Sequence, residues 1–181
     1  MNVFVITCTK HTNLLAEFSE RFEKYWGGPF FVYVSDTDRE HWSNGVIKFL
    51  ESIKDEYFIL LHEDFYLTQP INKELLERLK KLAVELKADR VSLLGNHTPN
   101  RTFKLVEPDI FMHRGTAKYQ YSYEASIQKR EFLLKNLTED CNPNYAEKLR
   151  EEHTYGLILS SREPAIWYKD KMRGEKYEEI I

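Results

Sequence analysis

Cysteine is scarce in this chain: Cys8 and Cys141 are the two cysteines among 181 residues. Two thiols so distant in sequence exclude a disulfide-rich scaffold and a zinc knuckle. We expect both thiols to be buried and inert, with a single disulfide bridge between them as the alternative. No stretch approaches 18 consecutive apolar residues, so no transmembrane segment is predicted. Residues 1–6 include neither a basic leader nor a small-residue cleavage site, which predicts a soluble, cytoplasmic protein.

The chain also lacks an excess of charge of one sign. Its 26 basic and 29 acidic residues leave a formal net charge of -3. A general nucleic-acid binder needs a basic surface, so that class is excluded, and an anionic substrate would need a local cation. With 42% hydrophobic residues, no internal repeat and no linker, residues 1–181 are expected to form one domain that buries roughly 70% of its unfolded surface.

Apolar runs alternate with helical patterns along the chain. Strands are expected at residues 3–8, 30–34, 57–61 and 90–94, and helices at residues 13–26, 46–53, 72–86, 124–137 and 145–152. Residues 97–122 are expected to be irregular, with short extended pieces near 103–106 and 110–112. This order predicts an α/β fold in which helices flank a mainly parallel sheet and the four strands are neighbours.

The strand at residues 57–61 ends in three consecutive groups able to bind a metal, His62, Glu63 and Asp64. Ligands of open α/β sheets bind beyond the carboxyl ends of the strands, so these residues stand where a site would form. Strand alternation would place His62 and Asp64 on one side and Glu63 on the other. The alternative is a solvated strand end with a helix-capping acid.

Two separated segments resemble glycosyltransferases of the GT-A fold, in particular small bacterial and viral glycosyltransferase-like proteins, including those of archaeal viruses. The first segment has Trp42-Ser43, a helix to Ile53 and the run from Glu56 to Leu67, and the second runs from Tyr121 to Leu134. The resemblance covers most of residues 1–152. It implies a Rossmann-like nucleotide-diphospho-sugar transferase fold and, if the chain is viral, a location in the host cytoplasm.

The resemblance implies a site for a nucleotide-sugar. Asp64 would bind Mn²⁺ or Mg²⁺, with His62 or Glu63 as a second ligand or Glu63 on the ribose, because hard cations take carboxylate and phosphate oxygens. Base and ribose would be held by residues at the ends of the first two strands and by the acidic strand end, namely Thr7, Thr9, Asp36 and Glu63. A turn or cap role is the alternative for Thr9 and Asp36, and a plain polar strand end for His62.

The resemblance also implies a catalytic base on the acceptor side. Glu147 matches the family's last acid, Glu151 lies one helical turn later on the same face, and Glu124 is a third candidate. A solvated helix face is the alternative for Glu147 and Glu151. The chain departs from the family in two places, since His62-Glu63-Asp64 replaces Asp-x-Asp and no tryptophan follows Asn142-Pro143.

The expected function is metal-assisted transfer of a sugar from a UDP- or GDP-type nucleotide-sugar to a glycan or glycoprotein. A nucleotidyltransferase or a metal-dependent phosphohydrolase would share the acidic strand end and remains an alternative. A non-catalytic nucleotide-sugar-binding module is the alternative from a different class, for which the altered acidic motif argues.

Overall fold

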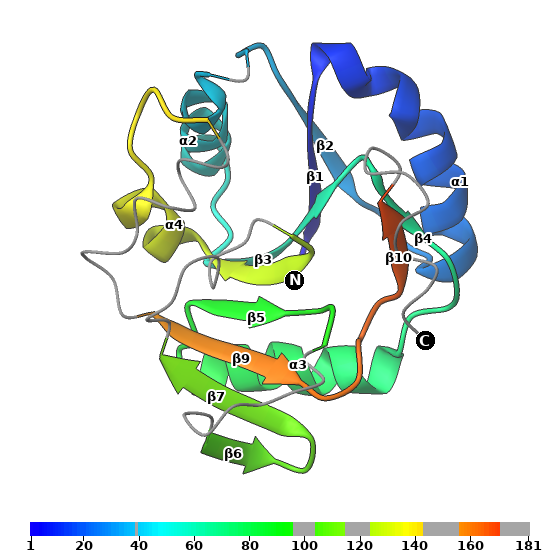
Figure 1. Ribbon diagram of the computed structural model, residues 1–181, viewed down its shortest axis with the longest axis vertical. Coiled ribbons are helices and arrows are strands. Elements are labelled where there is room, and N and C mark those ends of the chain that lie inside the picture. Colours follow the sequence, from blue (N-terminus) through cyan, green and yellow to red (C-terminus); the bar gives the residue numbers. More distant parts are fainter. Residues whose placement is uncertain (39, 96–103, 115–123, 143–155, 171–181) are drawn as a thin grey trace.

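The first half of the chain builds a parallel three-stranded unit. Strand β1 (Val3–Cys8) pairs in parallel with β2 (Phe31–Ser35) on one side and with β3 (Tyr57–His62) on the other. The computed structural model describes residues 1–38, 40–95, 104–114, 124–142 and 156–170. The expected α/β class is confirmed, because helices lie on both sides of an eight-stranded sheet (Figure 1).

Helical segments make the crossovers between these strands. After β1, the 3₁₀ helix η1 (Thr9–Leu14) leads into α1 (Leu15–Tyr25), which buries Phe18 and Phe22. Gly27 ends the helix with φ 70°, a conformation that glycine adopts at little cost. After β2, α2 (Trp42–Ser52) starts four residues earlier than the helix expected at 46–53.

The second half of the sheet differs from the expectation. The strand order is β2-β1-β3-β8-β5-β9-β7-β6, and β8 (Ser126–Lys129) runs antiparallel to both β3 and β5 (Arg90–Ser92). The strand predicted at 90–94 is therefore not a direct neighbour of β3. The parallel arrangement expected for the whole sheet holds for β1, β2 and β3 and again for β5 with β9 (Leu157–Ser161).

The helix predicted at 124–137 is wrong over residues 124–129, because residues 126–129 form β8 and α4 begins at Arg130 and ends at Asn136. Ser126, Ile127 and Gln128 are all buried between two strands. Pairing with two neighbours outweighs a local helical pattern. The helix predicted at 145–152 lies outside the described residues.

The remaining elements complete both layers. Helix α3 (Lys73–Glu85) is capped by Asn72, whose side-chain oxygen accepts a hydrogen bond from Leu75 N at 3.0 Å, as the sequence predicted. The extended pieces expected near 103–106 and 110–112 are a hairpin of β6 (Lys104–Glu107) and β7 (Ile110–Arg114). A separate two-stranded sheet joins β4 (Phe65–Leu67) to β10 (Tyr168–Asp170).

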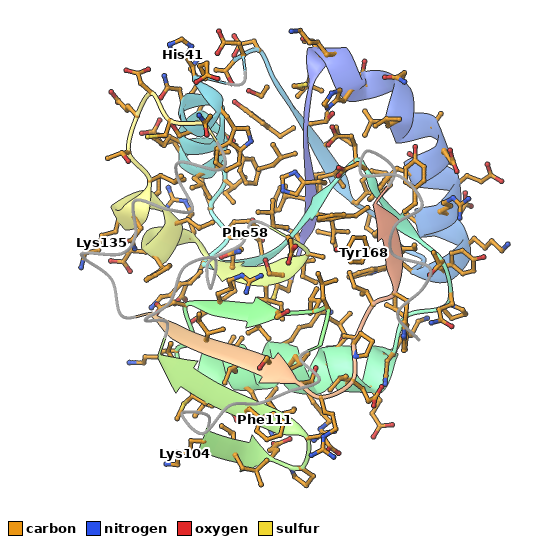
Figure 2. All side chains as sticks on the ribbon, viewed as in Figure 1. His41, Phe58, Lys104, Phe111, Lys135 and Tyr168 are labelled. Atoms are coloured by element: carbon orange, nitrogen blue, oxygen red, sulfur yellow. The ribbon has the colours of Figure 1, made fainter. Side chains whose placement is uncertain are left out.

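Two apolar clusters cover the two faces of the sheet. On one face, α1 and α3 pack on alternate residues such as Val5, Ile59 and Val91. On the other face, α2 and α4 pack on Phe58, Leu60 and Ile6, and Figure 2 shows Phe58 in the interior. None of the helices in the described part of the chain has the length and apolar character needed to cross a membrane.

Candidate active site

The carboxyl ends of β1, β2 and β3 meet at one edge of the sheet. Cys8 is level with Ser35 on one side, and Ile6 is level with His62 on the other. The loops that follow these strands carry the residues that the sequence singled out for nucleotide and metal binding. Because parallel strands end together, segments far apart in sequence converge here, at the place where open α/β sheets bind ligands.

The three polar residues after β3 form a tight turn into β4. Glu63 is buried, whereas His62 and Asp64 are half-buried, and residues 63 and 64 form a turn in place of the expected strand end. The His62 ring packs edge-on against Phe65 with 5.6 Å between centroids. The Asp64 carbonyl accepts a hydrogen bond from Tyr66 N at 3.1 Å. The turn therefore has one inward carboxyl group and two groups nearer the surface.

Glu63 has a partner that the sequence did not indicate. Its Oε1 lies 3.0 Å from Nδ1 of His11, a residue of η1. The contact joins the segment after β1 to the turn after β3, across 52 residues of chain. The sequence places His11 in the polar turn after the first strand, and the parallel order of β1 and β3 is the signal that could have brought the two residues together.

The two threonines of the first strand end differ in their surroundings. Thr7 is 3% exposed, and its Oγ1 donates to the Cys8 carbonyl at 3.3 Å. Thr9 is exposed at the start of η1, and its carbonyl accepts a hydrogen bond from Thr12 Oγ1 at 3.2 Å. Thr9 thus presents its side chain at the surface of this edge, while Thr7 lies beneath it.

Asp36 follows β2 and is exposed, with a side chain 80% exposed and Lys48 Nζ 3.7 Å from Oδ1. Its neighbours Ser35 and Thr37 share a hydroxyl hydrogen bond of 2.6 Å, and Thr37 N donates to Ser35 Oγ at 3.2 Å. Gly45 of α2 packs directly on both hydroxyls. This contact, which the sequence reasoning missed, fixes the loop that carries Asp36.

Glu124 lies at the same edge, just before β8. The last paired residues are Leu60 and Ser126, so His62 and Glu124 each stand two residues beyond that pair. Ser126 Oγ donates to the Glu124 carbonyl at 2.6 Å and accepts from Gln128 Nε2 at 2.8 Å. Ser126 and Gln128 belong to the second segment of the resemblance, and they hold the backbone of Glu124 from within the sheet.

Glu147 and Glu151 lie outside the described residues. The chain leading to them is anchored on the start of α2, where the Trp42-Ser43 pair stands. Ser43 Oγ accepts from Cys141 N at 2.9 Å, and Ser43 N donates to the Cys141 carbonyl at 3.0 Å. Asn44 and Asp140 exchange two hydrogen bonds of 2.8 Å. Ser43 therefore links the start of α2 to Cys141, and Asn44 links it to Asp140.

A histidine–aspartate pair stands beside this anchor. His41 Nδ1 lies 2.8 Å from Asp38 Oδ1, which also accepts from His41 N at 2.9 Å. The hydrogen bonds from the His41 backbone and ring lower the pKa of Asp38, and the Asp38 carboxylate raises the pKa of His41. Both side chains are exposed, and Figure 2 shows His41 at the outer end of α2.

Within the described residues, no group of three or more His, Cys, Asp or Glu side chains could hold a metal ion by itself. Asp64 and His62 fit a different kind of site. A Mg²⁺ site in a phosphate-processing enzyme uses one or two carboxylates and completes its coordination with substrate phosphates and water. Asp64 supplies one half-buried carboxylate at the edge where the parallel strands end.

No protein-family model and no curated protein matches the sequence. Among solved structures, the chain is similar to residues 1–349 of TarS from S. aureus, with a TM-score of 0.56, 16% identity, and coverage of 93% of this chain and 60% of that chain. It is also similar to TarS 1–349 in complex with UDP, with a TM-score of 0.57, 12% identity and the same coverage.

A third similar structure is A197 from STIV, with a TM-score of 0.51, 15% identity, and coverage of 93% of this chain and 84% of that chain. At these identities the likeness is one of fold. The chain spans about 60% of the TarS structures that it resembles.

Proposed function

We propose that this chain is a glycosyltransferase that moves a sugar from a nucleoside diphosphate to a hydroxyl group of a glycan or glycoprotein, assisted by Mn²⁺ or Mg²⁺. The observation that carries the proposal is the convergence of Thr9, Asp36 and Asp64 at the edge where three parallel strands end. A diphosphate donor requires hydroxyl and carboxylate partners for ribose and base, and an acid that can hold a cation.

The similarity of fold supports a nucleotide donor. TarS 1–349 has been solved with UDP, and the chain aligns with that structure over 93% of its own length. A UDP- or GDP-sugar is therefore the first donor type to test. Fold similarity alone does not define chemistry, so the proposal rests on the side chains at the strand ends.

The residues divide between donor and acceptor. Thr9 and Asp36 are exposed and would hydrogen-bond the ribose and base, with Thr7 packed beneath them. Asp64, with His62 beside it, would hold the cation, and that cation, when bound, offsets the charge on the departing diphosphate. A divalent ion is expected to bind strongly only together with the nucleotide, because the described residues lack a three-ligand site.

The acceptor side needs a base. Glu147, with Glu151 as its substitute, would take the proton of the acceptor hydroxyl as its oxygen bonds to the anomeric carbon. The sugar–phosphate bond breaks, and its electron pair leaves with the nucleoside diphosphate. The side chain of Glu63 is buried against His11, so it would support this site from below the surface.

A thermal-shift screen of UDP and GDP, each with and without Mn²⁺, tests the proposal, since a ligand that binds the folded state raises the melting temperature. We expect a rise that requires nucleotide and metal together. Product analysis with nucleotide-sugars then separates the alternatives. A transferase releases a nucleoside diphosphate, a nucleotidyltransferase releases pyrophosphate, a phosphohydrolase releases phosphate, and a binding module releases nothing.

A further inference from the structure

The contact between His11 and Glu63 joins a buried carboxyl group to a side chain 52 residues away in the sequence. The Glu63 side chain is 7% exposed, and the His11 side chain is 39% exposed. Burying a carboxyl group costs free energy unless a partner compensates for the lost water. His11 supplies such a partner at 3.0 Å, and it comes from a segment that follows a different strand.

The start of η1 depends on contacts of this kind. No residue of η1 is buried, and the residue that precedes it, Cys8, makes no side-chain capping hydrogen bond. At the far end of η1, Leu14 packs partly on the core and its carbonyl accepts from Tyr66 Oη at 3.3 Å. Thr9 and Lys10 are exposed at the near end. His11 is the point at which this near end is tied to the turn after β3.

We propose that His11 is a positioning residue of the nucleotide site: its Nδ1 holds the Glu63 carboxyl group and so fixes the start of η1, with Thr9, against the turn that carries Asp64. This inference rests on the proposed function, because the site that it positions is the proposed donor site. His11 acts through Glu63 and the backbone, and it is not assigned a contact with the nucleotide.

Two substitutions of His11 can distinguish a role of Nδ1 from a role of Nε2. Nδ1 is bonded directly to Cγ, so the amide nitrogen of asparagine stands at the same number of bonds from the backbone. The amide nitrogen of glutamine lies one bond farther out and corresponds to Nε2. If the bond from Nδ1 to Glu63 is the function, asparagine restores it and glutamine does not, since both amides donate hydrogen bonds.

The experiment compares His11→Ala, His11→Asn and His11→Gln with the wild-type protein. Calorimetry measures the affinity for UDP and GDP with Mn²⁺, and amide hydrogen exchange without ligand measures the opening of η1. We expect His11→Ala to weaken nucleotide binding by about tenfold and to speed exchange in η1 by a similar factor, the scale of one hydrogen bond to a buried charged group. His11→Asn should recover most of both, and His11→Gln should recover neither.

Arg78→Ala is the matched control. Arg78 pairs with Glu107 at 3.0 Å and, like His11, joins segments distant in sequence through a carboxylate. The control should leave nucleotide affinity and η1 exchange unchanged, so a general loss of stability can be told apart from a loss of positioning.

Three results overturn the inference. Unchanged affinity and exchange in His11→Ala would show that the tie positions nothing. Recovery by His11→Gln with failure of His11→Asn would place the function at Nε2, in contact with the ligand. Wild-type protein that binds neither UDP nor GDP would remove the proposed function and this role together, whereas wild-type affinity in His11→Ala would remove the role of His11 alone.

Discussion

Gly45 in α2 packs directly against Ser35 at the end of β2. A Cβ atom at position 45 would overlap Ser35 Oγ and come within 2.8 Å of Thr37 Oγ1. The missing side chain lets the helix approach the hydroxyl pair that shapes the loop with Asp36. A glycine inside a helix costs about 1 kcal/mol relative to alanine, and here it permits a close approach at the candidate site.

Gly45→Ala should therefore destabilise the protein, against the usual gain from helix propensity. Overpacking costs about 1–3 kcal/mol, so we expect the free energy of unfolding in urea to fall by about 1–2 kcal/mol and nucleotide affinity to fall with it. Glu51→Ala, at an exposed position of the same helix, should change stability by less than about 0.5 kcal/mol. A Gly45→Ala protein more stable than wild type would contradict the packing argument.

Asp64→Asn should keep the fold and lose Mn²⁺-dependent binding of a nucleoside diphosphate. The amide has a similar shape but is neutral and a weaker ligand for a hard cation. Calorimetry with UDP or GDP decides the result, and Asp109→Asn, an exposed turn position with φ 65° that asparagine tolerates, serves as the control. Unchanged metal and nucleotide binding in Asp64→Asn would place the site elsewhere.

Glu147→Gln should lower turnover by roughly a hundredfold or more while donor binding persists, if the enzyme inverts and Glu147 is the base. Steady-state rates across glutamine variants of Glu124, Glu147, Glu151 and Glu152 identify the base. A fully active Glu147→Gln moves the assignment to another member of the set. Activity in all four variants points to a retaining mechanism or to a base outside the set.

Tyr57→Phe should make the protein more stable. The Tyr57 hydroxyl is buried and has no hydrogen-bond partner among the described residues, so its removal should raise the free energy of unfolding by about 1 kcal/mol. Burial, with the nearby Glu56 and Asp89 charges, raises the pKa of Tyr57 to about 12.

The raised pKa of Tyr57 makes the stability difference between wild type and Tyr57→Phe depend on pH. The unfolded chain ionises Tyr57 near pH 10 and the folded chain near pH 12, so wild-type stability falls as pH rises through that window. Urea unfolding at pH 7 and pH 10.5 should therefore show a larger advantage for Tyr57→Phe at the higher pH. Tyr25→Phe, at a half-buried tyrosine, is the control. An equal difference at both pH values would falsify the raised pKa.

The His41–Asp38 pair should contribute to stability within a bounded pH range. The pKa of His41 is raised above its ordinary value of 6.5, so its contribution is complete below that value and is lost as pH rises through the folded-state pKa. The pKa of Asp38 is lowered from 3.8, so its contribution is complete above that value and is lost as pH falls. The pair is at full strength between about pH 4 and 6.5.

Melting temperatures of wild type and His41→Ala test this range. The difference should be largest near pH 5.5 and should shrink at pH 9, where His41 is neutral. Because both groups are exposed, 0.5 M salt should also reduce the difference at pH 5.5. A difference that is constant from pH 5.5 to pH 9 would show that the His41 ring contributes through contacts that do not depend on its charge.

The sequence predicted the parts of the fold that depend on local periodicity. The apolar run at residues 3–8, the spacing of Phe18 and Phe22, and the Asn72 cap each determine an element from its own residues, and each is confirmed. The placement of an acidic turn beyond β3 also followed from the sequence. These patterns show which face of a helix or strand is apolar. The sheet and its helices bury those faces against one another.

Features that depend on distant partners could not be predicted in the same way. Ile127 fits a helical pattern with Phe132 and Leu133, but strands on both sides of residues 126–129 override it. Strands β4, β9 and β10 are short and were missed. The His11–Glu63 contact and the packing of Gly45 require the positions of two strands at once, which a reading along one chain does not supply. The roles proposed for Thr9, Asp36, Asp64 and Glu147 stay predictions.

The insertion of β8 between β3 and β5 has a consequence for the order in which the protein folds. During synthesis, β3 and β5 emerge long before residues 126–129, the strand that pairs with both. Until then β3 has one edge without its partner, and the two halves of the sheet have no hydrogen-bonded link. Joining them requires closure of a long loop, which slows folding. The nascent chain therefore carries an apolar strand edge of the kind that chaperones protect.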